Sequence, residues 1–198
     1  ILPDGLEEIG SHAFWGASNL TKIDIPDTVQ KVGAQLFREC SSLLSVTLPE
    51  GIEVLDGFTF YNNYALMSVT LPSTLKTMGN QEFKNCTSLT SIVLPENLEY
   101  IGSTPFGGCT NLKEVIMPSL KEAYSYGSTT KPFVDCPALE KIVLGDGVEI
   151  LPKYFFHEME NLKQIDLPDK ITTIETYSFR LSGITSLVIP ANVTTIGT

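Results

Sequence analysis

Apolar and polar residues alternate in a short segment that recurs along the whole chain. In LTKIDIP, residues 20–26, the apolar Ile23 and Ile25 alternate with the charged Lys22 and Asp24. A period of two predicts a β-strand with one buried face. The proline that ends the segment cannot donate to a strand ladder, so the strand ends there. The segment recurs as LLSVTLP, LMSVTLP, LTSIVLP, LKEVIMP, LEKIVLG, LKQIDLP and ITSLVIP.

The spacing of the phenylalanines shows that this pattern belongs to a structural repeat. Five of them are 23 residues apart, and three more resume that step after one interval of 27: Phe14, Phe37, Phe60, Phe83, Phe106, then Phe133, Phe156 and Phe179. A period of roughly 20 to 29 residues with L-x-x-I-x-I positions is typical of a leucine-rich repeat solenoid. We therefore expect about eight to nine stacked coils with one long parallel β-sheet on one face.

The other face of each coil is predicted from the residues after the proline. Apolar residues follow it at three and six positions, as in Leu6 and Ile9, and favour short extended or 3-10 segments. About one helical turn is expected around each repeat phenylalanine. The repeat between 118 and 145 is four residues longer than most. Residues 1–198 are interpreted as one domain, and as a window cut from a longer array because both ends fall within a repeat.

Charge limits the kinds of partner. The chain has 23 acidic and 13 basic residues and a formal net charge of −10. This balance argues against a phosphate-binding surface, so nucleic acid is not expected as a partner. No apolar run approaches the roughly 18 to 20 residues that span a bilayer, so no membrane insertion is expected within this chain. No glycine-rich phosphate loop is present, and no cofactor is expected.

The repeats carry a specific resemblance. IGSTPFGGCTNLKEVIMP, MGNQEFKNCTSLTSIVLP and VGAQLFRECSSLLSVTLP resemble the BspA-like class of leucine-rich repeats, in which phenylalanine, cysteine, strand and proline follow in this order. The resemblance implies a secreted or cell-surface protein of bacteria or certain protozoa, used for adhesion or for binding partner molecules. It implies no catalytic residues, so the chain is not expected to be an enzyme.

The cysteines are predicted to be packing residues. Cys40, Cys86, Cys109 and Cys136 all lie three residues after a repeat phenylalanine, and so share one position of the coil. Free cysteine commonly packs as a small apolar residue. A zinc site needs four converging ligands, whereas the two histidines lie far apart along the array. We therefore predict reduced, buried thiols and no metal site.

The outward strand positions are the candidate binding site. In one column the middle coils carry apolar residues, and the neighbouring column supplies a polar rim. The hypothesis is a binding surface for a protein or glycan ligand. The alternative is that β-branched residues simply favour strands, since three side chains fall short of a diagnostic apolar patch. The candidate residues are Val93, Ile116 and Val143, with Ser68, Thr70, Ser91 and Glu114 around them, and Tyr126 in the inserted segment.

Two classes of function remain open from the sequence. The first is a non-catalytic binding or adhesion module at a cell surface. The second is a structural spacer or self-associating array, in which flanking regions carry the function.

Overall fold

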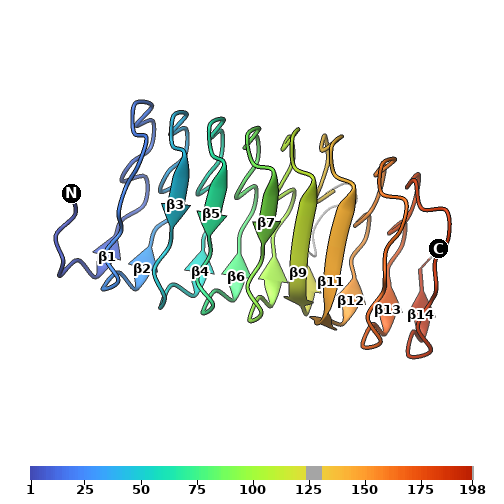
Figure 1. Ribbon diagram of the computed structural model, residues 1–198. Coiled ribbons are helices and arrows are strands. Elements are labelled where there is room, and N and C mark those ends of the chain that lie inside the picture. Colours follow the sequence, from blue (N-terminus) through green and yellow to red (C-terminus); the bar gives the residue numbers. More distant parts are fainter. Residues whose placement is uncertain (124–130, 198) are drawn as a thin grey trace.

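The computed structural model describes residues 1–123 and 131–197. The chain winds into a β-solenoid of about eight turns, with parallel strands and no helix among the described residues. Successive coils lie side by side along one axis, with the two termini at opposite ends (Figure 1). The predicted fold class is confirmed.

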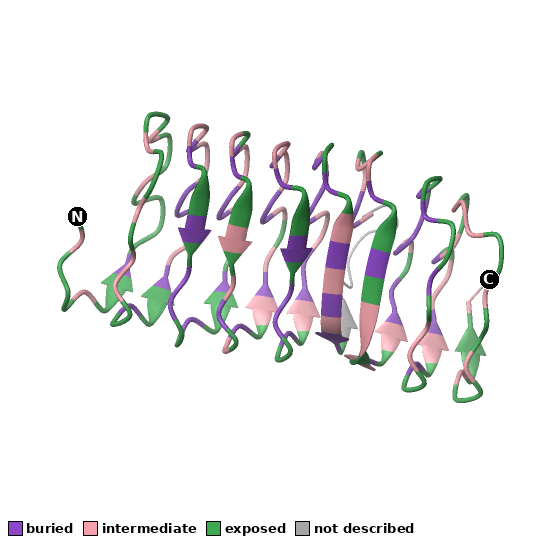
Figure 2. Cartoon of the chain, viewed as in Figure 1, coloured by how far each residue is buried: buried purple, intermediate pink, exposed green. Residues whose placement is uncertain are grey.

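One side of the solenoid is formed by the strands that were predicted before the repeat proline. The predicted end at the proline is wrong for one of them, which continues through Pro118 to Leu120. Neighbouring strands pair in parallel with equivalent residues opposite each other, such as Val46 with Val69 and Ile92 with Val115. Buried and exposed residues alternate along these strands (Figure 2). We call the outward surface of these strands the front face. The strands are β3 (Ser45–Thr47), β5 (Ser68–Thr70), β7 (Ser91–Val93), β9 (Glu114–Leu120) and β11 (Lys141–Val148).

The front strands form hydrogen-bonded groups instead of one unbroken ladder. One group contains β3 and β5, and the other contains β7, β9 and β11. Residues 162–168 and 184–190 follow the same path without forming strands. In a repeat array each coil buries its apolar edge against its neighbours, whether or not its segment forms a strand.

The return side consists of two-residue strands, which confirms the extended segments expected there. They also pair in parallel, for example Met78 with Ile101. The strands are β1 (Glu8–Ile9), β2 (Lys31–Val32), β4 (Val54–Leu55), β6 (Thr77–Met78), β8 (Tyr100–Ile101), β10 (Glu122–Ala123), β12 (Ile150–Leu151), β13 (Thr173–Ile174) and β14 (Thr195–Ile196).

The helical turn expected around each phenylalanine was wrong. Hydrogen-bonded turns take its place, with left-handed residues on both sides of the phenylalanine, such as Gln35 (φ 60°) and Glu39 (φ 61°) around Phe37. A right-handed helix cannot contain such residues, because it needs consecutive negative φ angles. Their backbone groups bond to the next coil instead, as in Gln35 N–H to Gly57 O at 3.1 Å.

Stacked phenylalanine rings form the centre of the core. Phe37, Phe60, Phe83 and Phe106 have no exposed surface, and neighbouring rings lie nearly parallel. Their centroids are separated by 5.2 to 5.7 Å. Since each ring contacts the ring before it and the ring after it, the stack ties several coils into one core.

The cysteines form a second internal column. Each thiol donates to the carbonyl of a phenylalanine in the preceding coil, at 3.0 to 3.1 Å. All four are free cysteines, and Cys136 is the one that is only half-buried. Burial raises the pKa of Cys40 to about 11, so this thiol stays protonated and donates at neutral pH.

Asn63 interrupts the cysteine column, and this gives a prediction. Its side chain is fully buried, and neither amide atom has a hydrogen-bond partner among the described residues. Asn63→Cys is expected to raise the free energy of unfolding by about 1 to 3 kcal/mol, because it removes unsatisfied buried polar atoms. By analogy with the other coils, the new thiol would donate to the carbonyl of Phe37.

Urea denaturation of Asn63→Cys under reducing conditions measures this gain. Cys86→Asn is the matched reverse variant, since Cys86 lies at the same position in the next coil. It is expected to lose stability. A variant Asn63→Cys no more stable than the parent would show that the hydrogen-bonding groups of the buried amide are satisfied in the native protein.

Candidate binding surface

The predicted apolar residues lie together on the front face. Val93 faces Ile116 across β7 and β9, and Ile116 faces Val143 across β9 and β11. Val93 is 58% exposed and Val143 is 38% exposed, whereas Ile116 between them is half-buried. The three side chains therefore form one continuous apolar strip across three coils.

The polar residues predicted beside this strip divide into two groups. Ser91 and Glu114 lie opposite each other in the same ladder as the strip, and Ser91 is exposed. Ser68 and Thr70 are also exposed but belong to β5, which does not pair with β7. Tyr126 lies outside the described residues.

One charge on this rim is neutralised. Glu114 forms an ion pair with Lys141, the residue opposite it on β11. Such exposed pairs contribute little to stability, but they fix side-chain positions beside the strip. The rim near Val143 consequently presents a paired charge and not a free carboxylate.

A second apolar group on the same side was not predicted from the sequence. Leu44 and Met67 are exposed at the start of their front segments, and Met67 N–H bonds to Leu44 O at 2.9 Å. Tyr64 is also exposed, three residues before Met67. The available signal was a pair of apolar residues, Leu-Leu and Leu-Met, where other coils have a polar second residue.

A shallow cleft adjoins the C-terminal end of the strip. It has a volume of about 580 Å³ and lies between β11 and residues 163–166. Val143 and Ile142 line one side, and Gln164 and Asp166 line the other. The strip thus borders a concave surface, which gives a ligand contacts on more than one side.

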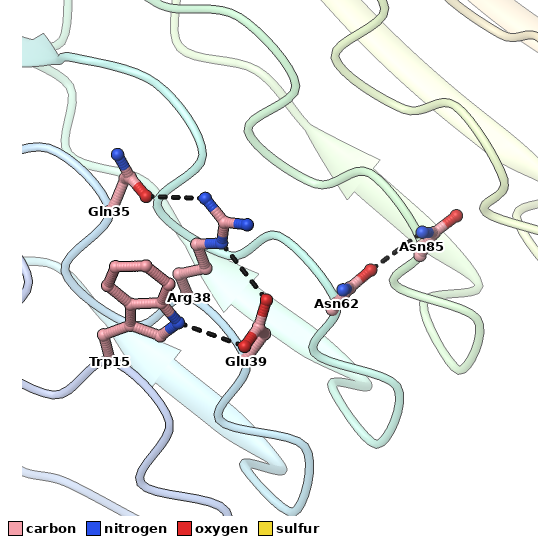
Figure 3. Close-up of polar contacts among 6 residues, drawn as sticks. All are labelled: Trp15, Gln35, Arg38, Glu39, Asn62 and Asn85. Carbon is pink, nitrogen blue, oxygen red and sulfur yellow. Dashed lines mark hydrogen bonds and ion pairs between the residues drawn. The ribbon is translucent and has the colours of Figure 1, made fainter.

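Trp15 lies away from the front face, at the edge formed by the turns (Figure 3). It is 47% exposed. Its Nε1–H donates to Glu39 at 3.1 Å, and the guanidinium of Arg38 lies 4.7 Å from the ring centroid. These contacts join Trp15 to the following coil. Next to them, Asn85 donates to Asn62 at 2.8 Å.

Among the described residues, the titratable and nucleophilic side chains do not form a metal site or an activated nucleophile. No group of three or more histidine, cysteine, aspartate or glutamate side chains there could hold a metal ion. Burial raises the pKa of the Cys86 and Cys109 thiols, which keeps them protonated and poorly nucleophilic.

The fold and this arrangement define a class of protein: a leucine-rich repeat solenoid with an exposed strand face. The family model described as the BspA type leucine rich repeat region (6 copies) matches residues 7–128 and 129–198. The chain belongs to this family, which confirms the resemblance seen in the sequence. Leucine-rich repeat domains of this kind are typically non-catalytic.

Solved structures share the fold. A leucine-rich repeat protein from Bacteroides ovatus is 27% identical with a TM-score of 0.75, over 97% of this chain and 49% of that one. The T. pallidum leucine rich repeat protein is 25% identical with a TM-score of 0.69, over 82% of this chain and 77% of that one. The pneumococcal vaccine antigen PcpA is 22% identical with a TM-score of 0.54, over 98% of this chain and 55% of that one. At this identity the similarity extends to the fold only.

The chain spans about half the length of the Bacteroides ovatus protein. No protein of curated function matches it. Within the described residues there is no helix of sufficient length and apolar character to cross a membrane.

Proposed function

We propose that the chain is a non-catalytic binding module that recognises a protein or glycan partner through its front face. The observation that carries this proposal is the apolar strip of Val93, Ile116 and Val143, which lies in register across three paired strands. Rigid strands hold these side chains in place, so little conformational entropy is lost when a partner binds. A bacterial cell surface is the proposed location, from membership in the BspA-type family.

The front face differs from the return side in a way that supports this assignment. The return strands are two residues long, and charged pairs lie on them or directly before them, such as Lys31 of β2 with Glu8 of β1, and Lys76 with Glu53 before β6 and β4. Interfaces are depleted of charged residues at their centres. The front face places its apolar residues centrally, with serine, threonine and a paired glutamate around them.

The proposal predicts that charges on the strip abolish binding. The double variant Val93→Lys/Ile116→Glu is expected to lose binding by at least about tenfold, because it places charges inside a desolvated contact. Parent and variant are screened against arrays of extracellular-matrix proteins and glycans. The matched control is Val54→Lys/Thr77→Glu, which introduces the same two charged residues at paired positions of the return side.

The results separate the candidate functions. Binding by the parent and the control, but not by the front-face variant, supports the proposal. Equal binding by all three excludes the front face as the site. If the parent binds nothing on either array, the proposal fails, and the structural spacer gains support.

A further inference from the structure

The stacking of the coils is interrupted at one turn. Elsewhere, the residue two positions after the phenylalanine donates its N–H to the next coil, as in Asn85 to Gly107 O and Gly108 to Val134 O, both at 2.8 Å. Within the described residues, no such bond joins Asp135 to His157. We call this interface between residues 131–144 and 153–166 the seam.

Phe155 explains the seam. It directly precedes the repeat phenylalanine Phe156, at a position that other coils fill with smaller residues such as Thr59 or Ser178. Its ring is 1% exposed and lies edge-on to Phe133 at 5.7 Å and to Phe156 at 4.9 Å. The parallel stacking that joins the other neighbouring phenylalanines is therefore replaced by edge-on contacts, and the backbone bond at the turn is missing. A side-chain bond from Asn161 to Pro137 O still crosses the seam.

A cleft of about 410 Å³ lies at the seam. Phe133 and Met159, which are 5% and 7% exposed, form its apolar floor. This volume lies within the range of about 300 to 1,000 Å³ that is usual for pockets that enclose a small ligand or a side-chain anchor. The cleft is therefore large enough for one long side chain, with its stem against the apolar wall.

The rim of the cleft is acidic. Asp135 comes from one side of the seam, and Glu158 and Glu160 come from the other. Lys131 pairs with Glu158, whereas the carboxylates of Asp135 and Glu160 form no ion pair among the described residues. His157 also lines the cleft, and burial lowers its pKa, so it adds no positive charge at neutral pH. Its Nδ1 is buried and makes no hydrogen bond within the same residues, but it lies 3.5 Å from Oε1 of Glu158.

We propose that this cleft receives an arginine or lysine side chain from an exposed segment of a partner protein. The alkyl stem packs against Phe133 and Met159, and the cationic head lies at the rim between Asp135 and Glu160. Long basic side chains bury their stems while keeping the charge at a polar rim. Arginine is also enriched among residues that anchor interfaces. The site is distinct from the front-face strip and does not depend on its function.

The test uses the peptide acetyl-Gly-Arg-Gly-amide, with acetyl-Gly-citrulline-Gly-amide as its uncharged match. Titration at low ionic strength is followed by amide chemical shifts of the isotope-labelled protein. The arginine peptide is expected to bind at least about tenfold more tightly than the citrulline peptide, because a charge-assisted contact is lost in the latter. The shifts are expected at residues 133–139 and 157–161.

The variant Asp135→Asn/Glu160→Gln tests the rim directly. It is expected to reduce binding of the arginine peptide at least about tenfold, whereas the control Asp27→Asn/Glu96→Gln, at exposed positions far from the seam, leaves it unchanged. Asparagine suits the left-handed backbone at position 135 (φ 56°), so the turn is retained. Equal affinity for the two peptides, shifts outside the seam, or an unaffected rim variant would each overturn the proposal.

Discussion

Phe83→Ala is expected to lower the free energy of unfolding by about 3 to 5 kcal/mol. Phe83 has no exposed surface, and its ring stacks on Phe60 at 5.2 Å and on Phe106 at 5.6 Å. The substitution therefore leaves a cavity that borders two coil interfaces. In a repeat array, stability is roughly the sum of coil and interface contributions, so weakening two adjacent interfaces also reduces cooperativity between the halves.

Urea denaturation followed by circular dichroism measures the loss. Phe179→Ala is the matched control, because Phe179 is only half-buried and stacks on Phe156 alone among the described phenylalanines. The control is expected to lose clearly less stability than Phe83→Ala. Equal losses would mean that the stacked column does not couple neighbouring coils.

The stability of the protein is expected to fall by about 3 kcal/mol as the pH rises from about 4.5 to about 7, because of Glu82. Burial raises the pKa of Glu82 from its usual 4.5 to about 7 in the folded protein, despite hydrogen bonds from backbone N–H groups. The backbone N–H groups of Thr59 and Gly79 donate to the Glu82 carboxylate at 2.8 and 3.1 Å. Between these two pKa values the folded state binds a proton that the unfolded state releases. The native state therefore loses stability as the pH rises through this window.

The variant Glu82→Gln isolates this contribution. Its neutral amide keeps an acceptor for the Thr59 N–H and does not titrate. The variant is therefore expected to become more stable relative to the parent as the pH rises from about 4.5 to about 7. Urea midpoints measured across pH 4 to 8, in steps of about half a unit, provide the comparison. Glu96→Gln, at an exposed position, is the control. Parallel pH profiles for the parent and Glu82→Gln would show that the buried carboxyl does not titrate in this window.

The repeat columns were predictable from the sequence because the same residue type recurs at each position of the repeat. Phenylalanine, cysteine and proline recur at fixed offsets, and these offsets alone place Phe60 and Phe83 in adjacent coils. The outward position of Val93 and Val143 follows from the period of two in the strands. The turns were less predictable. Residues such as Gln81 (φ 55°) have no intrinsic preference for left-handed backbone, and a hydrogen bond to the next coil, here to Ser103 O, accompanies that conformation.

The sequence by itself determined the coil, its period, its inward columns and the composition of the front strip, since local periodicity and repetition specify these features. The tertiary structure decided the features that depend on single departures from a column. Glu82 becomes a fully buried carboxyl, Asn63 becomes an unsatisfied amide, and Phe155 replaces the ring stacking at the seam with edge-on contacts. The physical reason is that the surroundings of each side chain are supplied by coils about 23 residues before and after it. One residue out of pattern therefore has an effect that depends on how both neighbouring coils pack around it.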